Sequence, residues 1–135
     1  MPASSRCSSP KPSEVWKRQC HIGASFPRAQ EMLARHAVGI DRIMWGSDYP
    51  HLEGCWPYST RHLRLAFADA PEAEVRALVG ENAARLYGFD LAALEPLAAE
   101  FGPSPAEIAR PLTAAEIPDD ALRCPAFAIA RMTAA

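Results

Sequence analysis

The order strand, helix, strand between residues 19 and 46 constrains the fold of this chain more than any other feature. The segment QCHIGAS, residues 19–25, is short and ends in small residues, which is typical of a strand. Residues 40–46 are apolar apart from Asp41 and Arg42, and their length and flanking glycines favour a buried strand. The intervening segment is long enough for a crossover between parallel strands, which needs roughly a dozen residues.

That intervening segment has the pattern of an amphipathic helix. Pro27 suits a first helical turn, and Gly39 would end the helix. Between them, apolar or aromatic side chains recur at the spacing of one helix face, at Ala29, Met32, Leu33 and His36.

A parallel sheet needs cover on both faces and normally has more than two strands. The sequence therefore predicts an α/β fold of which only the last part is present.

The rest of the chain is predicted to be mainly helical. Asp69-x-x-Glu72 is a capping box, Gly88 suits the left-handed residue after a helix, and Asp90 suits an N-cap. Pro96 is expected to interrupt the helix that Asp90 begins, because proline has no N–H to donate. Ser104 begins a second capping box, with proline at the first helical position.

The two ends of the chain lack a clear period. Residues 1–12 are rich in Ser and Pro and are predicted to be a disordered lead-in, whereas residues 112–135 are predicted to be an irregular tail. The opening residues have no apolar segment after their basic residues, so we expect no secretory signal and a cytoplasmic location.

Composition argues against several classes of protein. Hydrophobic residues make up 49% of the chain, which is enough for a core. The net charge of −2 comes without a basic run, so we expect no nucleic-acid partner. No apolar stretch approaches the roughly 20 residues that span a bilayer, so we expect no membrane partner either. The four cysteines form no C-x-x-C pair, which argues against a structural zinc knuckle or a disulfide framework.

A carboxylate stands at the end of the second predicted strand. Period-two geometry places Met44, Gly46 and Asp48 on one face, opposite the bulky Ile43 and Trp45. The carboxyl end of a parallel strand carries the chemistry in open sheets and in barrels. A carboxylate is costly to bury there unless it meets a cation or several donors. Asp48 therefore either bonds backbone amides of the following turn or ligates a metal.

Two sequence blocks carry a resemblance to a known family. WGSDYPHLEGCWP, residues 45–57, followed by GENAARLYGFD, residues 80–90, resembles the C-terminal signature of amidohydrolase-related proteins. These are metal-dependent hydrolases built on a (β/α)8 TIM barrel, and the group also contains decarboxylases. The resemblance implies that residues 13–111 are the C-terminal part of such a barrel domain. The fold would be a partial TIM barrel, its last two strand–helix units followed by a C-terminal helical extension.

The resemblance also implies roles for individual residues. Asp48 would be a metal ligand and the catalytic residue that positions metal-bound water or takes its proton. The divalent metal would be zinc, and the water would attack a C–N or C–O bond of a small-molecule substrate; decarboxylation is the alternative reaction. His51 and Trp56 are candidate substrate-binding residues, with loop packing as the alternative for both. Cys55 stands where relatives often have threonine.

The remaining metal ligands of that family come from earlier strands, and a full barrel needs about 250 residues. We therefore expect this chain to require an upstream segment or a partner chain, and to bind no metal by itself. Two other hypotheses stay open. The chain could be an inactive fragment or interaction piece with exposed strand edges, or residues 58–110 could form a small independent helical domain.

Overall fold

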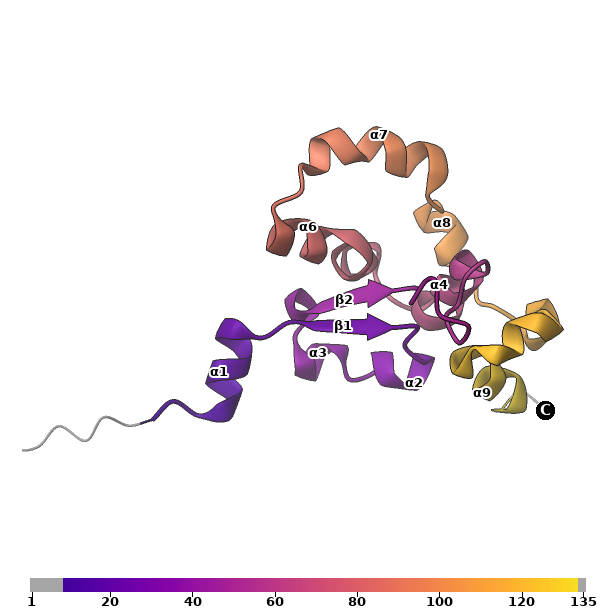
Figure 1. Ribbon diagram of the computed structural model, residues 1–135, viewed down its shortest axis with the longest axis horizontal. Coiled ribbons are helices and arrows are strands. Elements are labelled where there is room, and N and C mark those ends of the chain that lie inside the picture. The colour runs from indigo at the N-terminus through magenta and orange to yellow at the C-terminus, as the bar shows by residue number, and fades with distance from the viewer. Residues whose placement is uncertain (1–8, 134–135) are drawn as a thin grey trace, which may run out of the picture.

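The computed structural model describes residues 9–133. Its elements follow one another as an initial helix, a short β–α–β unit and then a run of helices (Figure 1). The elements are α1 (Pro12–Gln19), β1 (Ile22–Ser25), α2 (Ala29–Met32), α3 (Arg35–Val38), η1 (Ile40–Arg42), β2 (Ile43–Gly46), α4 (Ser59–Phe67), α5 (Glu72–Arg76), η2 (Ala77–Glu81), α6 (Asn82–Tyr87), α7 (Leu91–Phe101), α8 (Pro105–Ile108), η3 (Ala114–Glu116), η4 (Asp119–Arg123) and α9 (Pro125–Thr133).

The two strands pair in parallel, as the sequence predicted. Ile22 lies beside Ile43 and Ser25 beside Gly46, and the amide of Phe26 donates to the Gly46 carbonyl at 2.8 Å. Both strands are shorter than the predicted segments, because α1 extends to Gln19 before β1 and Ile40–Arg42 forms a 3-10 turn before β2. A small parallel sheet in a helix-rich chain is compatible with the α/β class.

The two faces of the sheet have different surroundings. Ile43, Trp45 and Ala24 share the face that packs against the helices, where Ile43 is buried. On the other face, a Cβ atom added at Gly23 or Gly46 would have no atom within 4 Å. The alternation agrees with the period-two expectation for residues 43–46. One sheet face is thus covered by helices while the other is open at its glycines.

Two clusters of buried side chains form the core. The first joins β2 to the helices that follow both strands, and its members are Met32, Ile43, Leu63, Phe67, Val75, Leu78 and Ile108. The second lies under the C-terminal residues, and its members are Cys55, Ile117, Ala121, Cys124, Ala126 and Phe127. Trp45 packs against both clusters, so β2 is the element that connects them.

The helix between the strands differs from the prediction. It is divided into α2 and α3 around Leu33 and Ala34, and Leu33 is 75% exposed although Met32 beside it is buried. The four predicted positions therefore do not bury one continuous face. Gly39 ends α3 with φ at 109°, which is the role that the sequence indicated.

The C-terminal residues are more ordered than expected. The segment predicted to be irregular forms η3, η4 and α9 over residues 112–133, and Phe127 is fully buried. Its apolar residues are spread over three short elements, which explains why no single period was visible in the sequence. Of the predicted lead-in, residues 1–8 lie outside the described range, and α1 begins at Pro12. The predicted domain boundaries stay predictions.

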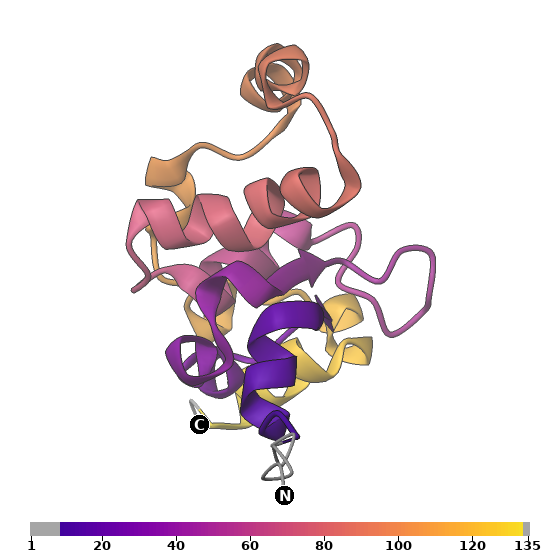
Figure 2. The ribbon, with the colours of Figure 1, turned by 90° about the vertical axis from the view of Figure 1, so that its left-hand side faces the viewer.

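Helix α7 stands apart from the rest of the fold (Figures 1 and 2). Asp90 caps it as predicted, accepting bonds from the amides of Ala92 and Ala93. Pro96 does not interrupt it, and the helix continues to Phe101, because an internal proline removes one hydrogen bond while its φ remains helical. No residue of α7 is buried. Among the described residues, no helix is both long and apolar enough to cross a membrane.

The register of the sheet allows a matched test of burial at one pair of neighbouring positions, Ile43 on β2 and Ile22 on β1. Ile43→Val should lower the free energy of unfolding by about 1 kcal/mol, because it removes a methylene group from a side chain that is 4% exposed. Ile22→Val is the control at the paired position, where the side chain is 42% exposed. Urea unfolding should place the control within about 0.5 kcal/mol of the unmodified chain. Both side chains lie on the same face of the sheet, so equal losses would contradict the difference in burial between the two strands.

Candidate metal centre

The loop that follows β2 closes on itself. The amide of Cys55 donates to the Ser47 carbonyl at 3.0 Å, and the amide of His51 donates to the Asp48 carbonyl at 2.9 Å. Gly54 lies inside this closure, where an added Cβ would be 2.8 Å from the Ser47 carbonyl oxygen. Only glycine fits there without a shift of the backbone. The residues from Ser47 to Cys55 therefore form one compact unit at the carboxyl end of β2.

Asp48 lies at the carboxyl edge of the sheet. Its backbone is left-handed, with φ at 61°, a conformation that aspartate tolerates better than most residues. The hydroxyl of Ser25, the last residue of β1, donates to Asp48 Oδ1 over a long 3.5 Å. Ser25 and Gly46 belong to the open face of the sheet. The carboxylate is thus close to the ends of both strands.

Three possible ligand groups gather in this loop. One ligand atom each from Asp48, His51 and Glu53 lies within 4.8 Å of the others, and His51 Nδ1 is 3.8 Å from Glu53 Oε1. His51 and Glu53 are mainly exposed. Carboxylate and imidazole groups are ligands that zinc and other divalent metals accept. From the sequence, His51 was expected to bind substrate and Glu53 was not a candidate. The spacing Asp-x-x-His-x-Glu within one loop was the signal that could have indicated all three residues.

The aromatic residues of the loop lie on its outer side. Trp56 and Tyr49 pack edge to face with ring centroids 5.3 Å apart, and both are more than half exposed. They form an exposed aromatic pair next to the three ligand groups in sequence. Cys55 is instead buried, and this burial raises the pKa of its thiol to about 11. Its thiol therefore stays protonated at neutral pH and packs in the core.

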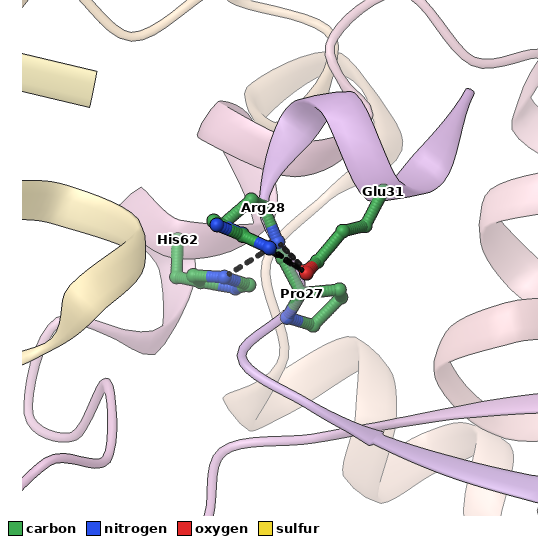
Figure 3. A network of polar contacts seen from close by, with 4 residues as sticks. All are labelled: Pro27, Arg28, Glu31 and His62. Atoms are coloured by element: carbon green, nitrogen blue, oxygen red, sulfur yellow. Dashed lines mark hydrogen bonds and ion pairs between the residues drawn. The ribbon is translucent and has the colours of Figure 1, made fainter. Parts of the chain in front are cut away.

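A buried histidine of α4, His62, contacts both β2 and the segment that follows β1. The indole N–H of Trp45 donates to His62 Nδ1 at 3.1 Å, and His62 Nε2 is 3.0 Å from the Pro27 carbonyl oxygen. Because an indole can only donate, Nδ1 accepts and Nε2 carries the proton. Figure 3 shows this ring beside Pro27, next to the pair formed by Arg28 and Glu31. Burial lowers the pKa of His62 to about 4, so the ring is neutral.

A second buried polar residue ties the helices to the start of β2. The side-chain amide of Asn82 donates to the carbonyls of Ile40 at 2.7 Å and Ile43 at 2.8 Å. Arg85 donates to the amide oxygen of Asn82 at 3.3 Å. Both residues belong to the second sequence block, and here they hold α6 against β2. Neither lies in the loop that carries Asp48.

This arrangement, a strand-end carboxylate on a parallel sheet with further possible ligands beside it, is of the kind found in metal-dependent hydrolases. A model of the amidohydrolase family matches residues 8–89, which is more than half of the chain. The chain therefore belongs to the amidohydrolase family. The matched region includes both strands, Asp48 and all but the last residue of the second sequence block, and it ends before α7. No curated protein and no solved structure matches the chain.

Proposed function

We propose that this chain is the C-terminal portion of a metal-dependent hydrolase barrel, in which Asp48 is both a metal ligand and the catalytic base. The observation that carries the proposal is the place of Asp48 at the carboxyl edge of two parallel strands, where Ser25 of the neighbouring strand approaches it. β1 and β2 with their helices would be the last two strand–helix units of a partial TIM barrel. The open face at Gly23 and Gly46 would then line the barrel interior.

The three ligand groups of the loop support a metal at this edge. Asp48 would bind it first, and His51 or Glu53 could add a second contact from the same loop. Zinc fits this mixed set of oxygen and nitrogen donors. When bound, such a metal supplies a water whose pKa falls to about 7. The other ligands would come from strands contributed by an upstream segment or a partner chain.

Asp48 would then move the proton of the reaction. Its carboxylate accepts a proton from the attacking water and returns it to the leaving nitrogen or oxygen of a small-molecule substrate. The exposed pair of Trp56 and Tyr49 offers an apolar wall on which a substrate could rest. A decarboxylase of the same family would use the same metal site to hold the substrate's oxygens instead.

A second candidate function is an inactive fragment or interaction piece. Its support is the open sheet face, together with the short strands of a two-stranded sheet. Two parallel strands are fewer than a parallel sheet normally contains. The two candidate functions predict different results when the missing strands are supplied. The enzyme portion should then bind metal and hydrolyse substrate, and the inactive piece should do neither.

Supplying those strands is the direct test. The chain would be expressed alone and together with the first six strand–helix units of an amidohydrolase-family barrel. Bound zinc would be measured by atomic absorption, and hydrolysis by a panel of small amides and esters. We expect tight stoichiometric zinc and hydrolysis only in the completed barrel. A completed, folded barrel that binds no metal would favour the inactive piece.

A further inference from the structure

The far end of the Asp48 loop is held by the C-terminal segment, residues 112–133. Arg123 Nη2 donates to the Trp56 carbonyl at 2.8 Å. The hydroxyl of Tyr58 donates to the carboxylate of Asp120, with oxygens 2.7 and 2.9 Å away. Two residues of η4 thus bond to two residues that end the loop, although more than 60 positions separate them in sequence.

These contacts bear on Asp48 through the closure of the loop. Cys55 is buried in the same cluster as Cys124 and Phe127 of the C-terminal segment. The Cys55 amide in turn bonds to the carbonyl of Ser47, the residue before Asp48. A displacement of residues 55–58 would therefore be transmitted directly to the backbone that carries the carboxylate.

The C-terminal segment is itself fixed to the body of the fold. The guanidinium of Arg64, on α4, donates to the carbonyls of Arg110 and Pro111 at 2.9 Å each and pairs with Glu116 at 2.9 Å. The side chain of Arg64 is 10% exposed, so its guanidinium is largely shielded from water, whereas the Glu116 side chain is 37% exposed. The Thr113 amide, followed by the Arg64 guanidinium, holds the pKa of Glu116 low, at about 2. The segment is thus attached both to a core helix and to the loop.

We propose that Arg123 and Asp120 are positioning residues for Asp48, and that the C-terminal segment sets the place of the catalytic carboxylate. The inference rests on the proposed function of Asp48. It goes beyond the family match, because that match ends at residue 89 and does not include the segment. Neither residue is a catalytic residue, since Arg123 acts through the Trp56 carbonyl and Asp120 through the Tyr58 hydroxyl.

Hydrogen exchange of the loop tests the inference without metal or substrate. Arg123→Ala should speed exchange of the His51 and Cys55 amides by about five- to tenfold, because each lost hydrogen bond makes opening of the loop easier. The amide of Phe26, bonded to the neighbouring strand, should keep its rate. Arg123→Lys, which can still donate to the Trp56 carbonyl, should restore most of the protection. Arg110→Ala is the matched control, because that exposed side chain lies outside these contacts.

Tyr58→Phe is the second variant, and it removes only the bond to Asp120. It should have a smaller effect of the same kind, which serves as the measurement should Arg123→Ala fail to fold. Unchanged loop rates in both variants would overturn the inference, as would an equal acceleration of every amide. Asp48→Asn should leave loop exchange unchanged. The catalytic role of Asp48 is tested by activity and bound metal, whereas the positioning role of Arg123 and Asp120 is tested by hydrogen exchange. Either role can therefore fail without the other.

Discussion

Asp48→Asn should lower the kcat/KM of a completed barrel by about 10²- to 10⁴-fold, the range associated with a general base. Asparagine has nearly the same shape, but it cannot accept a proton from water and it is a weaker metal ligand. The fold should be unaffected, because within residues 9–133 the carboxylate accepts only the long hydrogen bond of 3.5 Å from Ser25. Steady-state kinetics and bound-metal analysis on the same preparation would measure both consequences.

Two further variants separate Asp48 from its surroundings. Asp41→Asn changes an acidic residue that precedes β2 and pairs with Arg42, and it should leave activity unchanged. Glu53→Gln removes the nearest other carboxylate of the loop and should alter metal affinity more than proton transfer. A completed barrel that keeps full activity with Asp48→Asn would show that the assigned role is wrong.

Acid should destabilise the fold through His62. The unfolded ring has a pKa of 6.5 and the buried ring one of about 4, so the unfolded state takes up the proton first as pH falls. This contribution to stability is complete above pH 6.5 and is lost progressively down to about pH 4. Between pH 6.5 and 4.5 the free energy of unfolding should fall by about 2 kcal/mol. Urea unfolding across that range would measure it.

The pH window distinguishes His62 from the acidic groups. Glu116 has its pKa lowered from 4.5 to about 2, so its contribution is lost mainly below pH 4.5. His62→Leu should remove the slope between pH 6.5 and 4.5, although it also lowers stability at neutral pH because Trp45 and Pro27 lose their partner. His36→Gln, at an exposed histidine, should keep the slope. A slope that survives His62→Leu would exclude His62 as its source.

Local patterns allowed part of this fold to be predicted. The parallel strand pair followed from apolar runs and the length of their connection, and the helix ends at Gly88 and Asp90 followed from capping chemistry. The place of Asp48 just beyond the end of β2 followed from the length of the apolar run, whereas period-two counting does not reach it, because β2 ends at Gly46 and the backbone of Asp48 is left-handed. These features depend on residues that are neighbours in sequence, where backbone geometry decides the outcome.

Local patterns could not predict the long-range hydrogen bonds that hold the helices to the sheet and to one another. Trp45 and His62 meet across 17 positions, Arg64 and Pro111 across 47, and Asn82 and Ile40 across 42. Each pairing depends on how helices pack, and a single sequence gives no information on that. The C-terminal segment was expected to be irregular for the same reason, since its order comes from Arg64 and from burial against Cys55.

The exposed apolar side chains of α7 should affect the solubility of the protein. Leu91, Leu94, Leu97 and Phe101 are between 42% and 76% exposed, and all belong to one helix that contributes nothing to the core. Contiguous apolar surface of this kind promotes self-association as concentration rises. Because the helix is separate from both core clusters, charged residues substituted along it should raise the solubility limit and leave the melting temperature where it was.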